Sequence, residues 1–249
     1  MYVAASTGCF PGLDLVESLD KLADLEYTAV EIVVNEEHGQ IRPSELASKF
    51  DLFVQICRTS RKISPTAIFF DVDPTDPNYM DCFTMCSHLA KATKIVTLCV
   101  RPATLGTPFN EEVGRLQKLV SIGARAGAHI AVSTEADSLT DTPETVGSLC
   151  KSIKDLTVCL DPSHYIYGYP KPKDYDYLFE YVTHVRLRDT TKDNFQVQIG
   201  QGIIEYGKLV IQLNKISHNC ALCVDLAVLP NVDPIAELRK MRLLLESLL

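Results

Sequence analysis

The sequence predicts a single (β/α)8 barrel, and three observations lead to this prediction. Eight short runs rich in Val, Ile, Leu and Cys alternate with stretches that have helical periodicity. Such near-continuous apolar runs are typical of parallel strands covered on both faces. The length of 249 residues suits eight β-α units, and no Pro-, Gly- or Ser-rich linker divides the chain. We therefore expect residues 1–249 to form one domain.

The expected strands follow one another at regular intervals along the chain. They are Tyr2–Ala5, Ala29–Val34, Ala67–Phe70, Ile95–Val100, Ile130–Ser133, Leu156–Leu160, Val182–Leu187 and Ala221–Leu226. A doubly wound open sheet is the alternative, but it usually carries a Gly-rich turn after its first strand. Residues 6–12 read STGCFPG and do not match that pattern.

Helices are expected between these strands from apolar faces and from start signals. One face begins at Leu15, and another begins at Met80 after Asp76-Pro77 as N-cap and first helical residue. Further starts are expected at Asn110, where the helix should close near Gly127, and at the pairs Thr142-Pro143 and Asp233-Pro234.

Composition and charge narrow the classes of partner. The chain has 24 Lys and Arg residues against 32 Asp and Glu residues, a net charge of −8. This balance argues against nucleic acid and against an anionic membrane surface as partners. The longest apolar runs fall far short of the roughly 20 residues that a membrane span needs. With no recognisable signal peptide and nine scattered cysteines, we expect a cytoplasmic protein with reduced thiols.

Function in a (β/α)8 barrel lies where each strand ends and its loop begins. Ionisable residues follow most of the expected strands, and those after the fifth to eighth strands should converge on one side of the mouth. Buried charges that converge are costly unless they are paired or bound to a metal. The strand-end residues that we select are Arg101, Glu135, Asp161, His164, Arg186 and Asp225.

Structural roles compete with these functional ones. Glu135 and Asp137 could cap the next helix, and the sequence LDPSHY at residues 160–165 could be only an Asx turn. Asp71, Asp73 and Asp76 match a calcium loop poorly, so we expect turn and cap roles for them.

Three other features also have structural explanations. Cys220 and Cys223 form a CxxC motif next to His218, but on a strand they point to opposite faces, which disfavours a metal site. His88 and His129 look structural. Six of the ten tyrosines lie between residues 165 and 181, where they could stack on a sugar ring, pack a loop or form a subunit contact.

The order and spacing of several motifs resemble the sugar phosphate isomerase/epimerase family of the xylose isomerase-like barrel superfamily. The resemblance covers essentially the whole chain. The motifs are LEYTAVE at 25–31, STE at 133–135, LDPSH at 160–164, HVRLRD at 184–189 and IGQG at 199–202.

The resemblance implies a divalent cation, Mn²⁺ or Mg²⁺, held by carboxylates and a histidine. Glu135 and Asp161 match its first two ligand positions, Asp225 stands at the terminal glutamate position, and His164 matches a substrate-binding histidine. The cation would polarise a sugar carbonyl, while the carboxylates Glu135, Asp161 and Asp225 would move the proton.

The sequence departs from this pattern at the histidine ligand, where Arg186 stands. A guanidinium is always charged and cannot bind a metal. Arg186 could substitute for the cation by bidentate bonding to a carboxylate, or it could bind substrate together with Arg101. His184 shares a strand face with Arg186 but lies two residues deeper.

We therefore expect a sugar or keto-sugar isomerase or epimerase, or a related lyase, of carbohydrate metabolism. It would act on a small carbohydrate or sugar phosphate by proton transfer next to a carbonyl, with Mn²⁺ or Mg²⁺ or without any cofactor. The alternative is a non-catalytic carbohydrate-binding barrel with a degenerate metal site. An endonuclease IV-like nuclease is disfavoured by six histidines and the negative charge. A homodimer is compatible with the tyrosine-rich segment and the apolar C-terminal helix.

Overall fold

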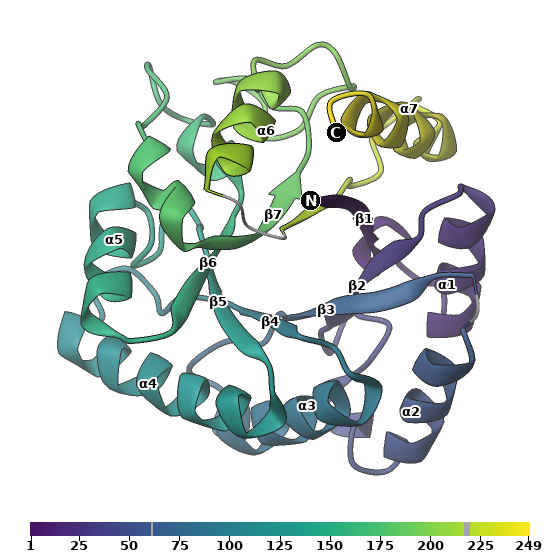
Figure 1. The fold of residues 1–249 in the computed structure, drawn as a ribbon, viewed down its shortest axis with the longest axis vertical. Helices are drawn as coiled ribbons and strands as arrows, with labels where there is room; N and C mark the ends of the chain where they lie inside the picture. The colour runs from purple at the N-terminus through teal and green to yellow at the C-terminus, as the bar shows by residue number, and fades with distance from the viewer. Residues whose placement is uncertain (61, 217–219) are drawn as a thin grey trace.

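Eight parallel strands close into a barrel in the computed structural model, which describes residues 1–60, 62–216 and 220–249 (Figure 1). Each strand pairs with its sequence neighbours, and β1 closes the ring on β8, with Tyr2 opposite Ala221. The strands are β1 Tyr2–Ser6, β2 Ala29–Val34, β3 Ser64–Phe70, β4 Thr97–Val100, β5 His129–Ser133, β6 Leu156–Leu160, β7 Val182–Leu187 and β8 Ala221–Val224. The predicted (β/α)8 barrel is confirmed.

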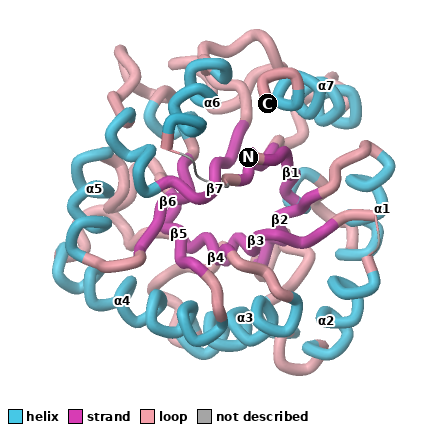
Figure 2. Tube along the Cα trace, in the orientation of Figure 1, coloured by secondary structure: helices cyan, strands magenta, loops and turns pink. Residues whose placement is uncertain are grey.

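Helices surround the ring of strands, as Figure 2 shows. The described residues contain α1 Leu15–Asp24, α2 Phe50–Thr59, α3 Tyr79–Thr93, α4 Phe109–Ala126, α5 Pro143–Ser152, α6 Tyr206–Lys215 and α7 Pro234–Glu246. Between β6 and β7 the connection has two short 3-10 helices, Pro162–Tyr165 and Asp176–Tyr181, in place of an α-helix. Neither α2 nor α6 was expected from the sequence.

Most predicted helix boundaries are confirmed by their caps. The Thr142 side chain accepts from Thr145 N at the start of α5, and Asp233 accepts from Ile235 N at the start of α7. Helix α4 ends at Gly127, which adopts φ 77°.

The predicted start of α3 was wrong. Asp76 does not cap this helix, because its carboxylate accepts from the backbone N–H of Asn78 in a turn, and the helix begins at Tyr79. At the other end, Ile95 was expected in a strand, but its N–H donates to Ala90 O and completes the helix terminus. Ile95 is buried without pairing in the sheet, so its apolar character alone misled the strand prediction.

The inside of the barrel is lined by unusually small side chains. Ala4, Ala29, Ala221 and Cys223 form one buried cluster, and Phe69 with Cys99, Ala131 and Cys159 forms another. Barrel interiors are more commonly filled by bulky branched residues. The small residues leave space for long polar side chains to extend inward, which matters for the site described below.

Two further observations concern the cysteines and the helices. All nine cysteines, each within the described ranges, are free thiols, and eight of them are buried. Among the described residues, the helices are too short or too polar for any of them to traverse a bilayer.

Substituting Gly202 tests the packing of the loop after β7. A Cβ at Gly202 would lie 2.6 Å from the backbone nitrogen of Thr190, and the Asp189 carboxylate that accepts from Gly202 N would also be displaced. We expect Gly202→Ala to lower the free energy of unfolding by about 1–3 kcal/mol, measured by urea denaturation. The control is Gly207→Ala in α6, where a Cβ meets nothing within 4 Å. An equal effect of both substitutions would contradict this prediction.

Candidate functional site

A cavity of about 360 Å³ lies where the strands end, and all six residues selected from the sequence line it. Within the described residues, four carboxylates and three guanidinium groups line this space. The acidic, basic and histidine residues of this lining are His38, Asp71, Arg101, Glu135, Asp161, His164, Arg186, Arg188 and Asp225.

The carboxylate of Glu135 is held in a fixed orientation by Arg101, which directly follows β4, and by Ser133 at the end of β5. Arg101 donates from Nε and NH2 to Glu135 Oε2 at 3.1 and 3.0 Å, and Ser133 Oγ donates to Oε1 at 2.6 Å. The backbone N–H of Glu135 donates to Thr140 Oγ1. Because Thr142 caps α5, a capping role for Glu135 or Asp137 is wrong. Glu135 instead presents a fixed carboxylate to the cavity.

Asp161 has two roles at once: it forms a turn, and it takes part in the charged contacts of the cavity. Its Oδ1 accepts from Ser163 N at 2.9 Å, which is the expected Asx turn. Its Oδ2 accepts from Arg188 NH2 at 2.8 Å, and the same nitrogen lies 2.5 Å from Asp225 Oδ2. One guanidinium nitrogen therefore bridges the two carboxylates.

Arg186 contacts two different carboxylates. It does not form the bidentate contact with a single carboxylate that the sequence analysis considered. Its NH2 lies 3.0 Å from Asp225 Oδ2, and its Nε lies 3.4 Å from Glu31 Oε1 deeper in the barrel. The guanidinium also stacks on Phe69, with its carbon 3.9 Å from the ring centre. Burial would lower the pKa of Arg186, but Asp225 and Glu31 outweigh it and raise that pKa above its usual value.

Glu31 and His184 continue this charged column into the barrel interior. Both side chains are fully buried, and His184 Nε2 lies 2.8 Å from Glu31 Oε2. Burial would raise the pKa of Glu31, but the charge of Arg186 and the contact with His184 hold it below its usual value. Burial likewise opposes ionisation of Asp225, yet Arg186 and Arg188 lower its pKa. The column therefore consists of mutually compensated charges.

His164 offers a hydrogen-bond donor to the cavity. Its Nδ1 accepts from the backbone N–H of Ala136 at 3.1 Å, so the neutral ring carries its proton on Nε2. Burial, outweighing the attraction of Asp161, lowers the pKa of His164 below its usual value of 6.5. Its Nε2 lies 3.8 Å from Asp161 Oδ2, beyond hydrogen-bonding distance.

Asp71 is a correction to the sequence analysis, which gave it only a turn role. Asp71 lines the cavity, where its Oδ1 lies 3.5 Å from Arg101 NH1 and its Oδ2 lies 3.1 Å from His38 Nε2. Asp73 and Asp76 do stabilise turns, since they accept from Thr75 N and Asn78 N.

The tyrosine-rich segment packs against itself and does not contribute a tyrosine to the described lining of this cavity. Tyr165 stacks on Tyr175 with ring centres 5.7 Å apart, and its hydroxyl donates to Thr140 O. Tyr169 donates to Asp141 and lies under Lys173, whose nitrogen is 3.7 Å from the ring centre. Of the three interpretations, this contact pattern favours a packed loop.

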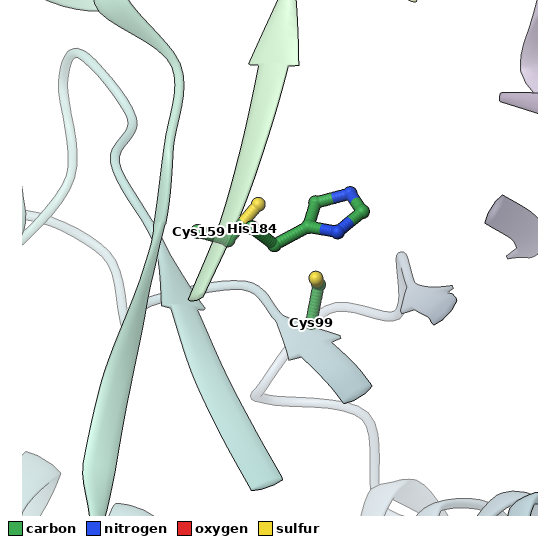
Figure 3. Close-up of side chains that lie close together, drawn as sticks. All are labelled: Cys99, Cys159 and His184. Carbon is green, nitrogen blue, oxygen red and sulfur yellow. The ribbon is translucent and has the colours of Figure 1, made fainter. Parts of the chain in front are cut away.

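Below the cavity floor the barrel interior contains a candidate buried metal site. Cys99, Cys159 and His184 extend from three strands into the same space (Figure 3), with their ligand atoms within 4.8 Å of one another. Glu31, His184 and Cys223 form a second such group. The CxxC motif itself does not form a site, because Cys220 and Cys223 pack in different clusters. His218 and Asn219 lie outside the described residues.

The carboxylates at the mouth do not fit the divalent cation that the resemblance implies. Neither candidate metal group in the described part of the chain includes Glu135, Asp161 or Asp225. One oxygen of Asp161 and one of Asp225 are already bridged by Arg188, and Arg186 stands where a histidine would ligate. A dication there would be repelled by two guanidinium groups.

Sequence reasoning missed the roles of Arg188 and Glu31, although a signal for both was present. Side chains on one strand alternate between the two faces, so position 188 continues the inward row of 184 and 186. Glu31 is the single charged residue within the apolar run AVEIVV of β2, and a charge there needs a buried partner. The identity of this partner depends on which strands face one another in the closed barrel, and the sequence does not show that arrangement.

Comparison with known proteins identifies the fold family. Among solved structures, a D-tagatose 3-epimerase-like protein shares 18% identity at a TM-score of 0.76, covering 100% of this chain and 98% of that one. A xylose isomerase-like TIM barrel protein from Mycobacterium smegmatis, solved with magnesium, shares 11% identity at a TM-score of 0.78, with coverage of 100% and 98%. The IOLI protein, solved with a zinc atom, shares 17% identity at a TM-score of 0.69, with coverage of 91% and 89%.

At these identities the structural matches show the fold alone. A search of curated protein sequences finds no match. The family model described as "Xylose isomerase-like TIM barrel" matches residues 19–241, nearly the whole length of the chain. The chain therefore belongs to the xylose isomerase-like TIM barrel family.

Proposed function

We propose that the protein is a sugar or keto-sugar isomerase or epimerase, or a related lyase, that transfers a proton next to a carbonyl. The observation that supports this most is the convergence of Glu135, Asp161 and His164 on one cavity together with guanidinium groups. Proton transfer next to a carbonyl requires a positioned base and a positive group near the developing oxyanion. The cavity offers both within one small volume.

Glu135 is the proposed base of this reaction. Arg101 and Ser133 fix the direction of its carboxylate. Oε2 accepts two hydrogen bonds from Arg101, whereas Oε1 accepts one from Ser133 and retains a further lone pair that can accept a proton. A base that is held in place before substrate arrives avoids the cost of reorganising in the transition state. Arg101, 42% exposed in its side chain, lies at the rim, where it can also contact substrate.

Asp161 and Asp225 are the proposed second acid-base pair, and His164 is the proposed contact to a substrate hydroxyl. The Nε2–H of His164 is free to donate because its Nδ1 already accepts from Ala136. Arg186 anchors Asp225 from below through the 3.0 Å contact.

An uncharged carbohydrate suits this lining better than a sugar phosphate. Carboxylates outnumber guanidinium groups in the cavity, and each of the three arginines is already within 3.0 Å of a carboxylate oxygen. A phosphate dianion would have to displace one of these contacts and would meet the remaining carboxylates.

Deuterium exchange tests the proposal directly. Incubating the protein with a panel of ketopentoses and ketohexoses in D₂O should place deuterium at the carbon next to the carbonyl of at least one sugar, as followed by NMR. If calorimetry shows that a sugar binds but no sugar in the panel takes up deuterium, the proposal of catalysis is contradicted.

A non-catalytic carbohydrate-binding barrel is the second candidate. One observation favours it: guanidinium groups lie within 3.0 Å of Glu135, Asp161 and Asp225 and so occupy carboxylate oxygens that would otherwise face a substrate. This candidate predicts saturable sugar binding with no exchange, so the same panel separates the two functions.

A further inference from the structure

Arg188 occupies the point from which a cation would bridge the two carboxylates. Its NH2 lies 2.8 Å from Asp161 Oδ2 and 2.5 Å from Asp225 Oδ2. Both are short charge-assisted contacts between a guanidinium nitrogen and a carboxylate oxygen. The same oxygens would be the ligands of a divalent ion held between these residues.

Two further contacts hold Arg188. The carbon of its guanidinium lies 4.7 Å from the centre of the Phe195 ring, and the Tyr206 hydroxyl donates to the backbone carbonyl of Arg188 at 3.2 Å. The residue is 9% exposed, although it lines the cavity. Arg188 is therefore a built part of the mouth and not a surface side chain that happens to reach inward.

The charges around Arg188 are largely compensated without a metal. Asp161, Asp225 and the deeper Glu31 carry three formal negative charges, and Arg188 and Arg186 compensate two of them. Adding a dication would leave this group with uncompensated positive charge in a partly buried site, which is costly.

We propose that the guanidinium of Arg188, held by Asp161 and Asp225, takes the place of a divalent cation at this mouth and polarises the substrate oxygen without a metal. The role toward substrate rests on the proposed function, since it assumes that the substrate binds in this cavity. The exclusion of metal does not depend on turnover. A guanidinium can serve this purpose because its remaining N–H groups donate to an oxygen that develops negative charge.

Manganese binding after chelation tests the proposal, with electron paramagnetic resonance and calorimetry as readouts. The wild type should bind no Mn²⁺ at the mouth. The double variant Arg188→Ala with Arg186→His frees Asp161 and Asp225 and adds an imidazole, so its affinity for Mn²⁺ should rise at least about 100-fold.

The matched control is Arg101→Ala. It removes one positive charge from the same cavity but leaves Arg188 between its two carboxylates. If removing charge alone were sufficient, this variant would gain Mn²⁺ as well, and the specific role of Arg188 would be wrong. We expect no gain.

Two other outcomes would overturn the proposal. The first is tight Mn²⁺ binding by the wild type that disappears in Asp161→Asn. The second is a folded double variant, judged by circular dichroism, that still binds no Mn²⁺. Should that variant not fold, Arg188→Gln with Arg186→His keeps a polar side chain in the site and serves as the second test. Failure of the deuterium exchange, by contrast, would leave these metal measurements unchanged.

Discussion

Replacing Glu135 with glutamine should reduce deuterium exchange into a keto-sugar substrate by at least about 100-fold while leaving the fold unchanged. Glutamine keeps the size of the side chain. Its single oxygen can still accept from Arg101 while its amide nitrogen donates to Ser133 Oγ, but it cannot take up a proton. The measurement is the exchange rate by NMR at saturating sugar, with circular dichroism and thermal unfolding as checks of the fold.

Glu144→Gln is the control for this substitution. Glu144 is an exposed glutamate in the first turn of α5, outside the cavity. The same chemical change there should leave exchange within about twofold of the wild type, because no reacting group is touched. Exchange by Glu135→Gln at the wild-type rate would show that Glu135 is not the base.

Replacing Glu31 with alanine should lower the free energy of unfolding by about 3–5 kcal/mol, the largest stability effect that we expect. Glu31 is fully buried, and its removal leaves Arg186 and His184 without their carboxylate inside the barrel. Urea denaturation at pH 7 measures the effect. The control is Glu111→Ala in α4, where the glutamate is exposed and a change within about 0.5 kcal/mol is expected.

A paired substitution separates lost charge compensation from lost volume. The double variant Glu31→Leu with Arg186→Met replaces both members of the pair by apolar side chains of similar size. It should recover most of the lost stability, because the cost in the single variant comes from an uncompensated charge. If the double variant were no more stable than Glu31→Ala, this explanation would be incorrect.

Glu31 should also make the free energy of unfolding depend on pH. Its folded pKa lies below the usual value of 4.5, against the opposing effect of burial, because of Arg186 and His184. A carboxyl with a lowered folded pKa contributes stability that is fully present above its unfolded pKa and is lost as pH falls through the folded value. The difference in stability between the wild type and Glu31→Gln should therefore be constant at neutral pH and shrink below about pH 4.

The sequence predicted the barrel well because parallel strands carry a strong local signal. The bounds of β2, β6 and β7 agree with the predicted ones, since each consists mainly of β-branched and other apolar residues even where a polar side chain such as Glu31 or His184 interrupts it. The errors arose where a residue is buried but does not pair with a neighbouring strand. Ile95 is as buried as a strand residue but lies two residues past the end of α3, where its N–H donates to Ala90 O.

The candidate site was predictable to the extent that strand ends meet at one face of a barrel. That rule alone is sufficient to bring Arg101, Glu135 and Asp161 to one cavity, where all three lie. It does not reveal which carboxylate pairs with which guanidinium group. Arg188 lies 27 residues from Asp161 and 37 residues from Asp225 in the sequence, and no periodicity encodes its contacts with these two residues.

The dual use of Asp161 limits how this protein could be altered. One of its oxygens holds the turn that presents His164, and the other holds Arg188. Any substitution at this position would therefore disturb the loop conformation and the positive group at the same time. An engineer who seeks a new substrate preference would do better to vary the lining residue His38, whose contact with Asp71 leaves that turn and Glu135 untouched.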